Sequence, residues 1–129
     1  MANPVITNVG LVSRNDRAAF VSACIIDGAS ITADGVVKRG ALLVKNTSGA
    51  LTKWHVYASG DALVADGVRI LQDDAKVVAA QDAFAAGYLE GFFVLSALID
   101  ANSAASLVAG DLTLAAGFHM IEADEVRLK

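Results

Sequence analysis

Hydrophobic residues occur along this chain in short runs that are separated by turn-forming residues. Over about the first 95 residues this pattern favours strands rather than helices. The run at 92–95 is apolar on both faces, which indicates a central strand that is buried on each side. The pattern predicts strands at 20–26, 41–45, 50–57, 68–72, 76–80, 88–97 and 118–121, with a loop at 81–87.

The best-defined hairpin joins 41–45 to 50–57 through the segment 46–49. Its sequence, Asn-Thr-Ser-Gly, suits a tight turn because glycine tolerates positive φ and the polar side chains bond their own backbone. We therefore expect a mainly β protein (a β-rich α+β fold), built as a small compact β-barrel or β-sandwich-like domain.

The two ends of the chain depart from this pattern. Asp100 could cap a short helix over 101–109, a similar helical turn is expected at 112–116, and a charged tail follows at 122–129. Residues 1–16 hold Pro4, three asparagines and a polar cluster without helical spacing. We predict an extended arm at 1–16 and a single β-rich domain at 17–129, with an ordinary edge strand as the alternative for the arm.

Composition and charge narrow the classes of function. The chain has 129 residues, of which 55% are hydrophobic and 19% charged, so it forms one folded domain rather than a disordered segment. The net charge is −4 and the basic residues are scattered, which disfavours both nucleic acid and an anionic membrane surface as partners.

No uncharged run approaches the roughly 20 residues that a membrane-spanning helix requires. The first residues lack the basic region and apolar core of a signal peptide. We expect a protein that stays in the cytoplasm where it is made, or leaves it by lysis.

The candidate chemistry is sparse. Cys24 is the only cysteine, and its apolar surroundings predict a buried, inert thiol. His55 and His119 lack a second ligand at metal-binding spacing, so both are expected to be packed or partly exposed strand residues. Asp73 and Asp74 could bind a cation or act as an acid–base pair, but adjacent strand residues point to opposite faces, which favours a strand-ending polar pair.

Other motifs of enzymes and cofactor-binding proteins are absent from the sequence. The segment 61–67 fails the alternating pattern of a calcium loop. The chain also contains no nucleophile elbow, phosphate loop or dinucleotide fingerprint. We therefore expect no enzyme activity, no catalytic residues, no cofactor and no bound metal. A fold of short strands with few charges must close on itself or associate, which favours a homo-oligomer.

Three segments, in order, resemble the head decoration (capsid cement) proteins of tailed bacteriophages, the family of the lambda D protein. They are 34–43 continued by 45–54, then 68–75, then 87–94 leading to 97–98, and a weaker similarity follows at 114–118. The order and spacing of these strand-and-turn segments carry the resemblance. Arg69 stands where the family pattern has a glycine, and the alanine-rich helical segment of the family is shortened here.

This resemblance implies a virion structural protein on the outer surface of the expanded capsid. Such proteins bind the major capsid protein as homotrimers at three-fold and quasi-three-fold sites, and they clamp the shell against internal DNA pressure. In that family an N-terminal arm becomes ordered on the shell. Val5, Ile6 and Val9 of the predicted arm could pair with a capsid-protein strand by β-augmentation.

Two other classes stay open. A small β-barrel carrier or ligand-binding module is one, because 35–43 also resembles the hairpins of biotinyl and lipoyl domains. Neither Lys45 nor Lys53 has the neighbouring residue that such domains require beside the modified lysine. The other is a further structural role in a phage tail or fibre.

Overall fold

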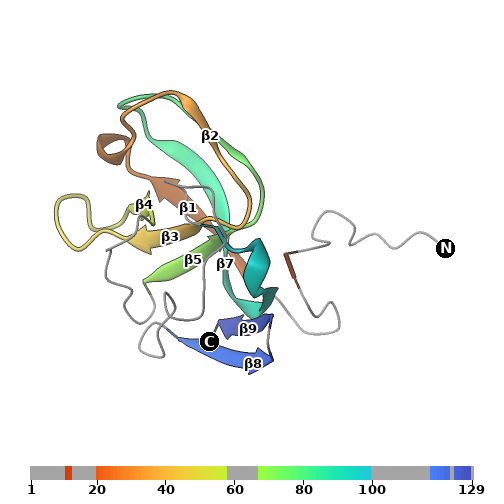
Figure 1. The fold of residues 1–129 in the computed structure, drawn as a ribbon. Coiled ribbons are helices and arrows are strands. Elements are labelled where there is room, and N and C mark those ends of the chain that lie inside the picture. Colours follow the sequence, from red (N-terminus) through yellow and green to blue (C-terminus); the bar gives the residue numbers. More distant parts are fainter. Residues whose placement is uncertain (1–10, 13–19, 58–66, 100–116, 123, 129) are drawn as a thin grey trace.

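The computed structural model describes residues 11–12, 20–57, 67–99, 117–122 and 124–128. Figure 1 shows that strands are the main element of the described residues. Two 3-10 turns, η2 (Gly28–Ser30) and η3 (Leu95–Ala97), are present, and none of the described residues is in an α-helix. The strands are β1 (Phe20–Ile26), β2 (Gly35–Val37), β3 (Leu42–Lys45), β4 (Trp54–Val56), β5 (Val68–Leu71), β6 (Ala75–Val77), β7 (Ala83–Val94), β8 (Phe118–Glu122) and β9 (Glu125–Leu128).

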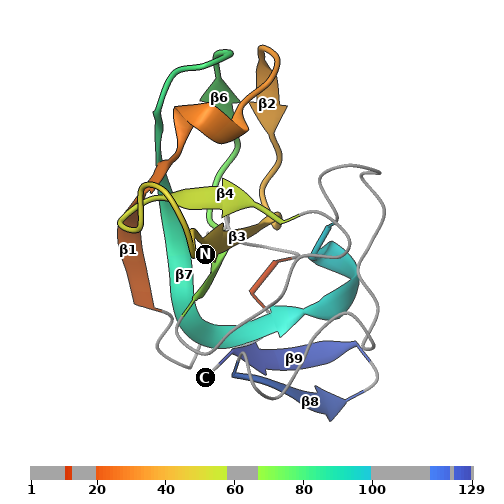
Figure 2. The same ribbon diagram turned by 90° about the vertical axis from the view of Figure 1, so that its left-hand side faces the viewer.

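Five of these strands close into a barrel. The order β1-β4-β3-β5-β7 is completed by pairing of β7 with β1. The β1–β4 pair is parallel and the other pairs are antiparallel, so the barrel is mixed. β9 adds to β7 and β8 adds to β9, while β2 and β6 form a separate pair at the opposite end of the molecule (Figure 2). The prediction of a mainly β domain is confirmed, and the architecture is a barrel with additional strands.

The longest strand, β7, connects the parts of the molecule. Its first half pairs with β1, residues Gly87 and Tyr88 pair with β5, and Gly91–Val94 pair with β9. Gly91 has φ 148°, a value that favours glycine, where β7 passes from the barrel to the β8–β9 extension. One strand is therefore part of both units.

The predicted bounds of this strand were wrong at both ends. The sequence predicted a loop at 81–87 and a strand at 88–97, whereas β7 begins at Ala83 and 95–97 form η3. The first residues of β7 are mostly alanines, which have low β-propensity. They form a strand because β1 pairs with β7 along the whole length of β1.

Hydrophobic residues pack on both faces of β3, β5 and β7. In β3, Leu43 faces the barrel interior, and Leu42 and Val44 face a second core on the other side of the sheet. The barrel core also contains Cys24, Ile26, Ile31, Ala41, Trp54, Leu71, Ala75, Val77 and Ala83. The second core is built from Leu11, Leu42, Val44, Tyr57, Val68, Ile70, Tyr88, Phe93, Leu95, Leu98, Phe118, Val126 and Leu128.

The C-terminal residues are more ordered than the sequence predicted. A strand at 118–121 is present as β8, but the charged tail at 122–129 contains a further strand, β9. Val126 and Leu128 are buried in the second core, and these alternating apolar positions explain why charged residues between them do not prevent a strand. The helical turns expected at 101–109 and 112–116 lie outside the described residues.

Only Leu11 and Val12 of the predicted N-terminal arm are described. Leu11 is 1% exposed, and its carbonyl oxygen accepts a hydrogen bond of 2.8 Å from the Val94 amide. Val12 forms an isolated bridge with Phe93. Residues 11 and 12 are therefore part of the folded core, whereas Val5, Ile6 and Val9 lie outside the described residues.

Candidate functional site

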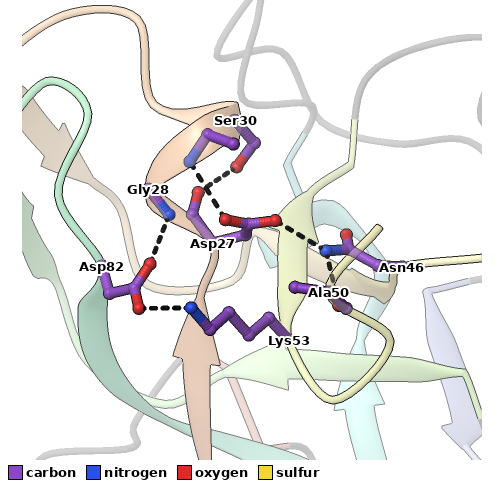
Figure 3. Close-up of polar contacts among 8 residues, drawn as sticks. Asp27, Gly28, Ser30, Asn46, Ala50, Lys53 and Asp82 are labelled. Atoms are coloured by element: carbon purple, nitrogen blue, oxygen red, sulfur yellow. Dashed lines mark hydrogen bonds and ion pairs between the residues drawn. The ribbon is translucent and has the colours of Figure 1, made fainter. Parts of the chain in front are cut away.

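A network of polar contacts holds the loops that follow β1 and β3 (Figure 3). The Asp27 carboxylate accepts from the Ala29 amide at 3.0 Å and caps η2, and the Ser30 hydroxyl donates to the Asp27 carbonyl at 2.7 Å. The Asn46 side-chain nitrogen donates to the same carboxylate and to the Ala50 carbonyl, each at 3.0 Å. The hairpin predicted at 41–45 and 50–57 is confirmed, with its second strand shortened to β4.

His55 takes part in this network from β4. Its Nδ1 lies 2.8 Å from the Asn46 side-chain oxygen. Because the nitrogen of that amide donates to two other acceptors, the oxygen faces the imidazole, and the network assigns the hydrogen to Nδ1. His55 is half-buried, as expected for a partly exposed strand residue, and this contact gives it a structural role.

An ion pair joins the same loops to β7. Lys53 Nζ lies 2.6 Å from one oxygen of Asp82, and the other oxygen accepts from the Gly28 amide at 2.7 Å. The hydrogen bond to Asp82 raises the pKa of Lys53. The hydrogen bonds from Lys53 and then from the Gly28 amide lower the pKa of Asp82. Lys53 is one of the two lysines considered for a biotinyl or lipoyl-type hairpin, and its side chain is engaged in this ion pair.

The remaining titratable candidates show no catalytic arrangement within the described residues. The predicted burial of Cys24 is confirmed, and this burial raises the pKa of its thiol, which disfavours the reactive thiolate. Arg39, Asp73 and Asp74 line an open hollow, but Asp74 accepts from the Arg39 amide at 2.8 Å and pairs with Lys38 at 3.6 Å. The backbone amide of Arg39, more than the Lys38 charge, lowers the pKa of Asp74.

The described ranges contain neither a cluster of metal ligands nor a membrane-spanning helix. No three histidine, cysteine, aspartate or glutamate side chains among them gather in a metal-binding group. None of their helices has the length and hydropathy needed to cross a bilayer. The half-buried His119 lies on β8, opposite Arg127 of β9.

The strongest candidate surface is apolar and lies on the outside of the barrel. Residues that are opposite each other on paired strands share a face, so Ile25 and Phe84 form one pair and Ala23 and Ala86 the next. Val21 continues this row along β1. We call these five residues the outer β1–β7 face. Their neighbours Cys24 and Ile26 point to the barrel core instead.

Phe84 is the most exposed member of this face. Phe84 is 83% exposed although it pairs with Ile25 near the beginning of β7, and Val21 is 41% exposed. A large aromatic in water forgoes the stabilisation that burial of its apolar surface provides. Adjoining apolar residues on the surface of a soluble domain commonly mark an interaction site.

Sequence reasoning missed this face because it assigned Phe84 to a loop. The available signal is the alternation of small residues, Ala83, Ala85 and Gly87, with Phe84 between the first two. That alternation fits a strand whose inner face is crowded and whose outer face carries the aromatic ring. The pairing of Phe84 with Ile25, 59 residues away in the chain, follows only from the register of β1 and β7.

Comparisons with known proteins add no family to this geometry. No family model matches the chain, and no curated protein and no solved structure is significantly similar to it.

Proposed function

We propose that this chain is a phage virion structural protein that binds the outside of the expanded capsid as a homotrimer and stabilises the shell. The order of the strand-and-turn segments along the sequence supports this function. The mainly β architecture is compatible with it.

The outer β1–β7 face is the observation that carries the proposal. A decoration protein acts through its surfaces, and this face exposes Phe84 and Val21, with the half-buried Ile25 beside them, on a framework of paired strands. We assign this face to contact between copies of the chain. In the trimer, a second copy of the chain would cover the Phe84 ring and bury the apolar surface that the single chain leaves exposed.

Binding to the shell is attributed to the N-terminal residues that include Val5, Ile6 and Val9, which would add a strand to the major capsid protein. The ordering of such a segment costs about 1–2 kcal/mol per residue, so one copy alone would bind weakly. Three linked copies would bind more tightly through their effective concentration.

Co-sedimentation with expanded shells of the cognate major capsid protein tests this function. Deletion of residues 1–16 would also remove Leu11 and Val12, which belong to the second core. The informative variant therefore lacks residues 2–10 and keeps both. We expect saturable binding of the full chain and loss of binding by the variant, with its thermal unfolding unchanged.

The triple substitution Val5→Ser, Ile6→Ser and Val9→Ser tests the same segment without shortening the chain. Undiminished shell binding by the folded deletion variant would refute the role of the segment. Absence of binding by the full chain would refute the decoration function itself.

A further inference from the structure

Arg69 is an unusual residue for its position. It lies on β5 between Val68 and Ile70, and it is paired with Leu43, which is fully buried in the barrel core. Residues directly opposite each other point to the same side of the sheet, so the stem of Arg69 enters the barrel interior. A side chain at Gly87 would meet the Arg69 Cβ at 2.7 Å, which shows how closely β7 packs against this stem.

The guanidinium group reaches from β5 toward two other strands. Its Cζ lies 4.7 Å from the centre of the Trp54 ring on β4, in cation–π geometry. Its Nε donates to the Ser22 hydroxyl on β1 at 3.4 Å, and Nη1 donates to the Val68 carbonyl at 2.9 Å. Three contacts from separate strands thus fix the orientation of the group.

The positive charge of Arg69 has no negative partner among the described residues. The ion pairs of Lys38 with Asp74 and of Lys53 with Asp82 do not involve it. Desolvation of a charge is costly when no group compensates it, and the half-buried Arg69 is compensated in the described part of the chain only by neutral acceptors and the Trp54 ring.

The free part of the guanidinium is accessible. Arg127 Nε is the only side-chain nitrogen or oxygen in the described ranges that is buried and without a hydrogen-bond partner. Arg69 Nη2 makes no hydrogen bond there either, and because it is not such a fully buried atom it keeps some exposed surface. The donors that remain on Nη1 and Nη2 are available to a ligand, while the Trp54 ring holds the plane of the group.

We propose that Arg69, held by Trp54 and Ser22, is a binding site for a carboxylate group. A planar guanidinium with two free donors matches a planar carboxylate in a bidentate contact. A phosphate group would be served better by several cations, and the side chains of Lys38 and Lys53 are engaged in ion pairs with Asp74 and Asp82. The proposal does not rest on the capsid function, because binding at Arg69 can be tested with any small carboxylate compound.

The sequence provides a direct probe, because Trp54 is the only tryptophan of the chain. Its fluorescence is measured while sodium acetate replaces sodium chloride at constant ionic strength. We expect a saturable change with half-saturation on the order of tens of millimolar, as for one charge-assisted contact. The change disappears in Arg69→Gln and is weaker in Arg69→Lys, which keeps the charge but loses the planar fork.

Arg127→Gln is the matched control, because it removes the same charge from β9, which does not pair with β4 or β5. Circular dichroism confirms that each variant is folded, and Arg69→Lys keeps the test valid if Arg69→Gln unfolds. An equal fluorescence response in wild type and in folded Arg69 variants would overturn the proposal. A response to phosphate that exceeds the response to acetate would also overturn it.

Two further measurements identify the source of the carboxylate. If a second copy supplies it, Arg69→Lys weakens self-association in sedimentation velocity, and acetate has the same effect on wild type. If the shell protein supplies it, the substitution lowers co-sedimentation with shells and leaves self-association unchanged. If neither changes while the acetate response persists, the site takes a free small carboxylate. Absence of shell binding by the wild-type chain would bear on the proposed function, whereas absence of the acetate response bears only on this site.

Discussion

Gly40 shows how a single residue can determine the path of two loops. It has φ +93°, its amide donates to the Leu71 carbonyl at 3.0 Å, and its carbonyl accepts from the Ile99 amide at 3.2 Å. A Cβ atom at this position would lie 2.2 Å from the Ala97 carbonyl oxygen. The loop that leads into the barrel strand β3 is thus packed against the segment that follows β7.

Gly40→Ala should destabilise the protein by about 2–4 kcal/mol, because the substitution adds both backbone strain and a backbone clash. The measurement is the free energy of unfolding in urea. Gly35→Ala is the matched control, since a Cβ atom at Gly35 would have no heavy atom within 4 Å and the residue has no positive φ. Equal stability of the two variants would contradict the packing described for Gly40.

The Lys53–Asp82 pair predicts a pH dependence at acidic pH. The folded-state pKa of Asp82 lies below its ordinary value of 3.8, so the unfolded chain binds a proton first as the pH falls. The stabilisation is present above the unfolded pKa and is lost as the pH falls through the folded pKa. Asp82→Asn should therefore flatten the decline of the melting temperature below about pH 4.

The same pair acts with the opposite sign at alkaline pH. The folded-state pKa of Lys53 is raised above 10.5, so its contribution is present below the unfolded pKa and is lost as the pH rises through the folded pKa.

Asp73→Asn, which removes a carboxylate of the exposed hollow, serves as the control for the change of charge in Asp82→Asn. Parallel acid limbs in Asp82→Asn and wild type would show that the pair does not contribute.

The strands of the barrel were predictable where an apolar run ends at turn residues. β1, β3 and β5 each fit this description, and their predicted bounds agree with the structure to within one residue. The beginning of β7 and the whole of β9 do not fit it. The beginning of β7 depends on pairing with β1, which is distant in sequence, and β9 depends on pairing with β7 as well as with the adjacent strand β8.

The candidate sites were less predictable than the strands. Phe84 belongs to an apolar face only because of the register between β1 and β7, and Arg69 reaches Trp54 only because β4, β3 and β5 are neighbours in the barrel. Hydrophobic periodicity within one strand predicts neither the register between two strands nor the order of strands in the barrel. Asp73 and Asp74, which periodicity does describe, were correctly predicted to end a strand, since both follow β5.

The segment around Leu11 acts as an additional element of the second core. Leu11→Ala should lower the free energy of unfolding by about 2–5 kcal/mol, the usual cost of removing a buried leucine side chain. Leu51→Ala provides a control of the same chemistry, because Leu51 is exposed and should change stability by less than about 0.5 kcal/mol. Similar urea midpoints for both variants would mean that Leu11 does not pack as described.

At the scale of the whole molecule, the outer β1–β7 face predicts self-association. Phe84→Ser should weaken the oligomer by at least about tenfold in its dissociation constant, as for a central aromatic of an interface, while the monomer remains folded. Sedimentation velocity over a dilution series measures this change. Val36→Ser is the control, because Val36 is exposed on the separate β2–β6 pair.

An unchanged oligomer in Phe84→Ser would assign the contact between copies to another surface. A monomeric wild-type chain at all concentrations would remove the basis for the homotrimer in solution. Shell binding of Phe84→Ser then indicates whether trimers form only on the capsid.

The closure of the barrel by β1 and β7 also determines when the protein can fold during its synthesis. β1 obtains nearly all its hydrogen bonds from β7, whose residues lie about 60 positions later in the chain. Until β7 has left the ribosome, the apolar strand β1 has an unpaired edge, and the chain depends on rapid completion to avoid aggregation. Fragments that end before residue 83 should therefore be insoluble, so premature termination yields aggregates rather than partly active domains.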